Sequence, residues 1–147
     1  MKLLEFRDSL FLPHPRVEIF DFFSQAANLQ EITPPWLHFE LLSPPRQIFK
    51  GTEIDYRLKI HGIPLRWRSK ITAWEPPNRF VDEQARGPYR VWIHEHRFTT
   101  QNGGTLCEDH VRYAVLGGQL IAKLFVNRDI RTIFNYRSTR LREIFPT

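Results

Sequence analysis

The sequence predicts an α+β fold, in which a curved antiparallel β-sheet wraps around a long C-terminal α-helix and two short helices follow the first strand. Between residues 52 and 114, apolar and polar residues alternate in segments separated by turn residues, which is typical of antiparallel strands. Residues 119–145 instead repeat apolar residues at every third or fourth position, which is typical of an amphipathic helix. Because a twisted sheet curls over such a helix, we expect a gap between the two layers that large side chains or a ligand must fill.

Length and composition narrow the class of protein. A chain of 147 residues with 41% hydrophobic and 25% charged residues is expected to form one globular domain, residues 1–147. Its one cysteine, Cys107, excludes a disulfide framework and a thiolate zinc cluster within the chain. No segment resembles a transmembrane helix or a signal peptide, so we expect a cytoplasmic protein. The sequence leaves monomer and homodimer open.

The first elements are bounded by prolines. Residues 3–12 are predicted to form a strand, and Pro15 suits the first position of a short helix. A second short helix is predicted at residues 25–32 and a further strand at residues 36–42, each ended by a pair of prolines.

The next two strands are predicted to form a hairpin around His61-Gly62. A two-residue turn there sets apolar residues opposite apolar ones on one face and acids opposite bases on the other. A register shifted by one residue would destroy both matches. The predicted pairs are Tyr56–Trp67, Leu58–Leu65, Asp55–Arg68 and Glu53–Lys70.

A strand at residues 79–85 leads to a second hairpin around Asn102-Gly103, the strongest turn signal in the chain. The same counting places two histidines on the inward face of this hairpin. On the outward face it sets Arg97 opposite Glu108 and Glu95 opposite His110. The predicted inward pairs are Trp92–Tyr113, His94–Val111, His96–Asp109 and Phe98–Cys107.

The histidines are the sharpest chemical feature. Residues opposite each other in a sheet lie close enough for a hydrogen bond between His96 and Asp109. Such a pair is typical of a general base, of an anchor for a polar ligand group, or of a buried polar pair that fixes the register of the sheet. Asp82 and Gln84 would lie beside His94 and Trp92 if the turn after them lets them face inward.

A metal site is a further interpretation of the same residues, since His94-x-His96 with Asp82 and Asp109 is a plausible ligand set. Two histidines at this spacing on a strand also arise often by chance, and no cysteine lies near them. We therefore expect neither a metal ion nor a cofactor.

Taken together, these residues resemble the START and Bet v 1-like (SRPBCC) superfamily, and in particular its bacterial polyketide cyclase/dehydrase-like branch. The likeness extends over nearly the whole chain. The segments that carry it are residues 28–36, 51–56, 63–67, 80–84, 87–89, 92–98, 104–105, 109–113 and 133–137.

The resemblance implies the helix-grip fold and a cavity that binds a hydrophobic small molecule, such as a lipid, an isoprenoid or a polyketide-like compound. The residues expected to contact the ligand are those that face inward from the sheet and the last helix. They are Tyr56, Leu58, Trp67, Asp82, Gln84, Trp92, His94, His96, Phe98, Asp109, Tyr113, Leu120 and Leu124.

Two alternatives remain beside ligand binding. The first is a cyclase or dehydrase in which His96 is the base and Asp109 orients it. The second is a protein-interaction domain whose gap is filled by side chains.

The last helix carries five arginines, at positions 128, 131, 137, 140 and 142, and the chain has a net charge of +5. A basic patch of this kind is needed for binding nucleic acid. No nucleic-acid motif accompanies it, so we expect a solvated helix face and no nucleic-acid partner. Asn127 and Arg137 interrupt the apolar stripe of this helix and lie either in the cavity or at its edge.

Overall fold

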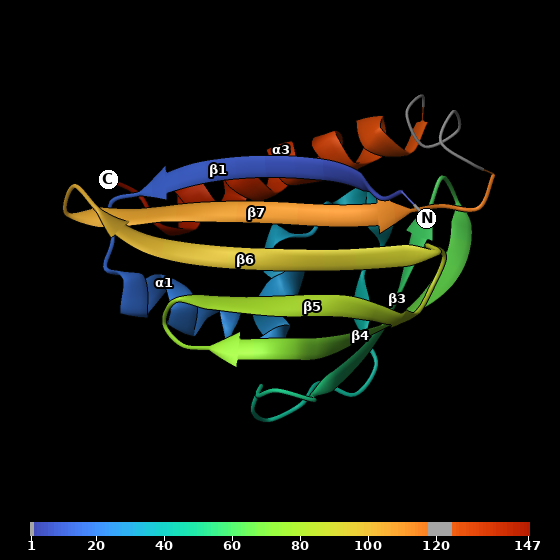
Figure 1. The fold of residues 1–147 in the computed structure, drawn as a ribbon, viewed down its shortest axis with the longest axis horizontal. Coiled ribbons are helices and arrows are strands. Elements are labelled where there is room, and N and C mark those ends of the chain that lie inside the picture. The colour runs from blue at the N-terminus through green and yellow to red at the C-terminus, as the bar shows by residue number, and fades with distance from the viewer. Residues whose placement is uncertain (1, 118–124) are drawn as a thin grey trace.

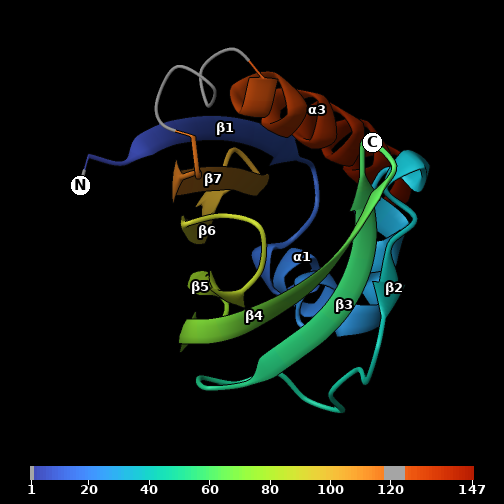
Figure 2. The same cartoon turned by 90° about the vertical axis from the view of Figure 1, so that its right-hand side faces the viewer.

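The computed structural model describes residues 2–117 and 125–147 and has one antiparallel sheet curled around a C-terminal helix, as predicted (Figure 1, Figure 2). The strand order is β1-β7-β6-β5-β4-β3-β2. The strands are β1 (Leu4–Leu12), β2 (Glu40–Leu41), β3 (Glu53–Ile60), β4 (Ile63–Glu75), β5 (Arg79–Arg86), β6 (Val91–Gln101) and β7 (Gly104–Ala114). The helices are α1 (Arg16–Phe23), the 3₁₀ helices η1 (Ala26–Ile32) and η2 (Pro35–Leu37), and α3 (Asn127–Ile144).

Both predicted hairpins are confirmed, with every predicted cross-strand pair in register. The turn residues explain this accuracy. His61 and Gly62 have φ angles of 50° and 80°, and Asn102 and Gly103 have φ angles of 50° and 77°. Two successive residues with positive φ form the tight turn whose twist matches that of the flanking strands, so each turn locks its register.

The segment before β3 differs from the prediction. Residues 36–42 do not form one strand, because Pro35–Leu37 form η2 and the strand β2 is limited to Glu40–Leu41. Between them His38 has a φ angle of 48°, a left-handed conformation that no strand accommodates. The short helix expected at residues 25–32 is present as the 3₁₀ helix η1.

The C-terminal helix was predicted over residues 119–145, whereas α3 covers Asn127–Ile144. Leu120 and Leu124, which were expected to contact the ligand, lie outside the described residues. Within α3, the apolar stripe faces the sheet as predicted. The buried residues of this stripe are Ile130, Phe134 and Leu141.

Helix α1 lies on the concave side of the sheet (Figure 2) and closes one end of the core. The ring of Phe20 packs against those of Phe80 and Phe98 at centroid distances of 5.9 and 5.5 Å. Burial of such rings is the main stabilising contribution of this end of the molecule. At this end, α1 bounds the space between the sheet and α3.

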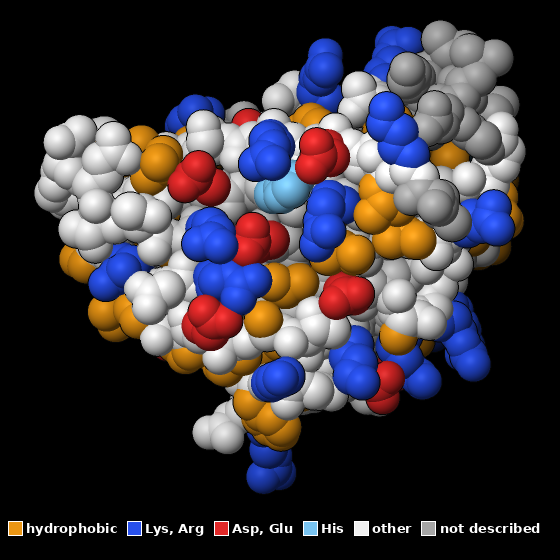
Figure 3. All heavy atoms as spheres, viewed as in Figure 1, with side chains coloured by type: hydrophobic (Ala, Val, Ile, Leu, Met, Phe, Trp, Pro, Cys, Tyr) orange, Lys and Arg blue, Asp and Glu red, His pale blue; other side chains and the backbone are white. Residues whose placement is uncertain are grey.

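The outer face of the sheet carries interspersed basic and acidic side chains (Figure 3). Arg68 pairs with Asp55 as predicted, at 2.8 Å. Glu95 instead contacts Arg79 at 2.9 Å, and His110 contacts Glu5 at 2.9 Å. Glu95 and His110 lie opposite each other as predicted, but their side chains bind other neighbours, since long side chains at a sheet surface reach several partners. Among the described residues, no helix has both the length and the apolar composition needed to cross a bilayer.

Candidate functional site

A cavity of about 210 Å³ lies between the concave face of the sheet and α3. Its wall is mostly apolar, with residues from strands β3 to β6, from α3 and from the irregular segment between α1 and β3. The interior is therefore not packed solid, as the interpretation of a filled gap would require. The lining residues are Phe23, Leu29, Ile32, Thr33, Leu37, Phe39, Ile48, Ile54, Tyr56, Leu58, Ile60, Trp67, Ser69, Ile71, Trp74, Phe80, Asp82, Tyr89, Trp92, His94, His96, Ile130, Ile133, Phe134 and Arg137.

Aromatic rings form one wall of the cavity. Tyr56 and Trp67, a predicted cross-strand pair, stack with an angle of 14° between their planes. Trp92 meets Trp67 edge to face at a centroid distance of 5.6 Å. These rings contact one another on several sides, so they form a rigid apolar surface for a flat or compact molecule.

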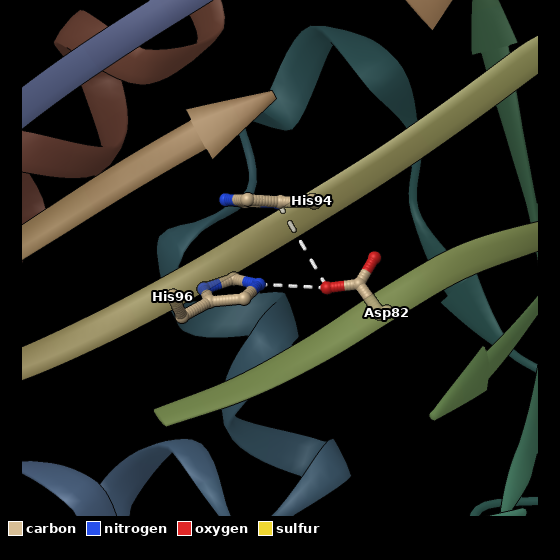
Figure 4. Close-up of side chains that lie close together, drawn as sticks. All are labelled: Asp82, His94 and His96. Carbon is tan, nitrogen blue, oxygen red and sulfur yellow. Dashed lines mark hydrogen bonds and ion pairs between the residues drawn. The ribbon is translucent and has the colours of Figure 1, made fainter. Parts of the chain in front are cut away.

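Polar side chains are concentrated on a second wall. His94 and His96 on β6 both point inward, each with 5% of its surface exposed, and Asp82 on β5 lies beside them (Figure 4). The two histidines face the same way because residues two apart in a strand lie on the same side of the sheet. The imidazole rings stack at a centroid distance of 3.6 Å, and Phe80 stacks on the other side of His96 at 3.9 Å.

Each of the two histidines forms its short hydrogen bond with a carboxylate other than the one directly opposite it in the sheet. Asp82 is opposite His94, and Asp109 is opposite His96. The Nε2 atom of His96, however, lies 2.7 Å from Oδ2 of Asp82, and that of His94 lies 2.7 Å from Oδ1 of Asp109. The predicted hydrogen bond between His96 and Asp109 is thus wrong, since their closest atoms, Nδ1 and Oδ1, are 3.4 Å apart. Both rings lean along the strand, past the residue directly across.

Arg137 of α3 completes this group. Its Nη2 atom lies 3.3 Å from Oδ1 of Asp109 and donates to Nδ1 of His96 at 3.4 Å. Since Nδ1 of His96 accepts, its Nε2 carries the proton and donates to Asp82. The side chain of Arg137 is 13% exposed. It lines the cavity, which decides between the two positions that the sequence left open.

Burial and charge shift the pKa values of this group in different directions. Burial raises the pKa of Asp82 above its ordinary value, against the opposing effects of His94 and Arg137. Burial also raises the pKa of Asp109, but Arg137 and the hydrogen bond from His94 outweigh it and hold this pKa well below its ordinary value. Burial, together with the charge of His94, lowers the pKa of His96 well below its ordinary value. At neutral pH, His96 is therefore a neutral imidazole and Asp109 a carboxylate.

Seven of the residues predicted to contact a ligand line the cavity: Tyr56, Leu58, Trp67, Asp82, Trp92, His94 and His96. Phe98 and Asp109 instead line a small adjacent pocket. Tyr113 is buried against α3, where its hydroxyl donates to Oδ1 of Asn127 at 3.5 Å. The prediction for Gln84 is not supported, because its side chain amide bonds both backbone groups of Tyr89 and braces the turn between β5 and β6.

The part of the cavity wall that comes from the irregular segment between α1 and β3 was not predicted from the sequence. Leu29, Ile32, Leu37 and Phe39 line the cavity, but they lie in or beside 3₁₀ helices, where no fixed period reveals which side faces inward. Ile130 and Ile133 were more accessible to prediction, since their spacing on α3 continues the apolar stripe.

Three side chains on this polar wall also have donor atoms suited to a metal ion. One nitrogen of each of His94 and His96 and one oxygen of Asp82 all lie within 4.8 Å of one another. The polar wall can therefore orient a ligand by hydrogen bonds, move a proton, or hold a cation.

Comparison with solved structures identifies the fold. The chain is similar to protein Ms6760 from Mycobacterium smegmatis, with 15% identity, a TM-score of 0.73, and coverage of 96% of this chain and 90% of that one. It is also similar to major latex-like protein 151 from Panax ginseng, with 10% identity, a TM-score of 0.75 and full coverage of both chains. These likenesses show the helix-grip fold.

A third similar structure is the nucleoside-diphosphate sugar epimerase from Corynebacterium glutamicum. Here the identity is 23% and the TM-score 0.67, and the match covers 94% of this chain but 28% of the epimerase. The fold thus also occurs as one part of a longer protein. No functionally curated protein matches the chain.

A family model gives the final assignment. It is described as polyketide cyclase / dehydrase and lipid transport, and it matches residues 12–135. The match includes the first hairpin, the strand β6 that carries His94 and His96, and the first half of α3, all of which contribute to the cavity. The chain therefore belongs to the polyketide cyclase / dehydrase and lipid transport family.

Proposed function

We propose that the protein binds a small hydrophobic molecule in the cavity between the sheet and α3. The observation that carries this proposal is the division of the cavity wall into a broad apolar surface and one compact polar group. Small-molecule sites commonly have this composition, because apolar contacts supply affinity and a few polar groups fix orientation. We expect the apolar body of the ligand to lie against Trp67 and Trp92 and its polar end to face Asp82 and His96.

The size of the cavity limits the ligand. A cavity of roughly 150 Å³ holds benzene, so a space of about 210 Å³ suits one or two fused rings or a short chain. Among the lipid, isoprenoid and polyketide-like compounds that the resemblance implies, we therefore expect only the smaller ones to fit.

Calorimetric titration with 2-naphthol tests this proposal, since this compound combines two fused rings with one hydroxyl group. We expect saturable binding of one molecule per chain, and weaker binding of naphthalene, which lacks the hydroxyl. Replacing the cavity-lining Ile133 by tryptophan is expected to weaken 2-naphthol binding at least roughly tenfold, since the larger ring occupies the site.

Thr132→Trp is the matched control, because Thr132 is the adjacent residue and is exposed on α3. Equal weakening by both variants, or no binding to the original protein, would overturn the proposal. Native mass spectrometry of freshly purified protein would then identify any molecule that occupies the cavity.

A second candidate function is proton transfer to or from the bound molecule. It is favoured by the hydrogen-bonded pair of His96 and Asp82, which is buried yet lies on the cavity wall. Such a pair suits the acid–base steps of cyclisation or dehydration. Asp82, rather than Asp109, would orient His96 in this reaction.

The test is incubation with a short linear poly-β-ketone, followed by mass-spectrometric detection of cyclised or dehydrated product. His96→Gln is expected to abolish product formation even at saturating substrate, whereas its effect on 2-naphthol affinity, through the lost contact with the hydroxyl group, is expected to be about tenfold or less. Product formation at the uncatalysed rate by the unmodified protein would reject the enzymatic function and leave the binding function in place.

A further inference from the structure

We propose that Asp82, His94 and His96 form a binding site for one divalent transition-metal ion, with Zn²⁺ as the ion that the donor set suits best. This inference differs from the expectation drawn from the sequence, which named Asp82 and Asp109 with the two histidines as a plausible ligand set but expected no metal ion. It goes beyond ligand binding, because it requires no organic molecule in the cavity.

Three possible donor atoms lie close together on the polar wall. Oδ2 of Asp82 lies 2.7 Å from Nε2 of His96 and 3.8 Å from Nδ1 of His94. Ligand atoms at about 2.1 Å from a tetrahedral Zn²⁺ are separated by roughly 3.4 Å, a value between these two distances. The three donor atoms all lie within 4.8 Å of one another, so side-chain rotations that draw the two histidine nitrogens together would bring all three to bonding distance. The ion would then take the place of the proton on Nε2 of His96.

The other nitrogens of the two imidazole rings both face Asp109. Its Oδ1 atom lies 2.7 Å from Nε2 of His94 and 3.4 Å from Nδ1 of His96. Histidines that bind a metal almost always give their second nitrogen to such an acceptor, which fixes the ring and raises its basicity. Asp109 already accepts from Nε2 of His94, and it could accept from Nδ1 of His96 once the proton of that ring has moved there.

Arg137 contacts Oδ1 of Asp109 at 3.3 Å and the Nδ1 atom of His96 at 3.4 Å. If an ion took the place of the proton on Nε2 of His96, the neutral ring would carry its proton on Nδ1 instead. That proton would be donated to Asp109, and Arg137 would keep only its contact with Asp109.

The surroundings of the three donors are rich in carboxyl groups. Asp8 is the neighbour of Asp109 in the sheet and accepts from the hydroxyl of Ser138 at 3.4 Å. Asp8, Asp82 and Asp109 thus lie around one guanidinium, that of Arg137, and a surplus of carboxyl groups over guanidinium groups favours a cation.

An ion and a further ligand can reach this site from the cavity. Asp82, His94 and His96 all line the cavity, so an ion bound by three protein ligands keeps an open coordination position on the cavity side. This is the arrangement of zinc sites that accept water or a further oxygen ligand, in contrast to closed structural sites. A carbonyl, enol or carboxylate oxygen of a cavity ligand fits that position.

The experiment uses the untagged full chain after dialysis against a chelator. We titrate Zn²⁺ by calorimetry and Co²⁺ by visible absorption, without any organic ligand. The expected result is uptake of one ion per chain, with the intense absorption bands of four-coordinate Co²⁺ and their displacement by Zn²⁺.

Variants locate the ion. His94→Gln, His96→Gln and Asp82→Asn are each expected to weaken binding by roughly 100-fold or more, and Asp109→Asn by about 10–100-fold, as typical of outer-shell partners. His61→Gln is the matched control, since His61 also contacts a carboxylate, that of Asp129 at 2.8 Å, but is exposed. Circular dichroism of each metal-free variant verifies that it is folded.

Absence of stoichiometric binding to the original protein would overturn the proposal, as would unchanged binding by the His94 and His96 variants or equal loss in His61→Gln. The outcome is separate from that of the ligand proposal, because 2-naphthol binding is measured with the chelator present.

Discussion

Replacing Arg137 by methionine is expected to lower the free energy of unfolding by about 3–5 kcal/mol, because it leaves the buried carboxylate of Asp109 without its guanidinium partner. Nη2 of Arg137 lies 3.3 Å from Oδ1 of Asp109, and both side chains are 13% exposed. Methionine keeps most of the apolar length that packs on Phe23 and Phe134. The loss therefore reports the charge rather than the packing, and urea unfolding at neutral pH measures it.

The control is Arg131→Met on an exposed position of the same helix, which is expected to change stability by less than about 0.5 kcal/mol. Adding Asp109→Asn to Arg137→Met should recover part of the loss, since the uncompensated charge is then removed. A loss below about 1 kcal/mol in Arg137→Met would be the result for an exposed ion pair. It would contradict the buried placement of this pair.

Phe23→Ala is expected to be the most destabilising apolar substitution near the site, with a loss of about 3–5 kcal/mol. The ring of Phe23 packs against Phe98 at a centroid distance of 5.3 Å and against His96 at 6.3 Å. It lines both the main cavity and the small pocket beside it. Its removal should therefore join the two spaces and enlarge the apolar site.

Urea unfolding with and without benzene tests both parts of this prediction. Benzene should stabilise Phe23→Ala more than it stabilises the original protein, because a larger apolar void binds it. Phe22→Ala, a change of the adjacent and half-buried ring, should cost less and show no added benzene effect. Equal costs for the two variants would contradict the assignment of Phe23 to the cavity wall.

The accuracy of the sequence analysis depended on local signals. The turns at His61-Gly62 and Asn102-Gly103 allowed the register of four strands to be predicted residue by residue. This succeeded because a two-residue turn and a period of two leave one register in which apolar residues and charges both match. The segment between α1 and β3 offered neither signal, and its strand was predicted wrongly.

The amino-acid pattern was sufficient for the fold, the inward facing of His94 and His96, and the apolar stripe of α3, because each follows from a period or a turn within one or two neighbouring segments. It was not sufficient for the partners of the histidines. Which carboxylate each ring reaches depends on how the side chains lean across three strands and on where α3 brings Arg137. Those are distances between segments far apart in the chain, and packing in three dimensions sets them.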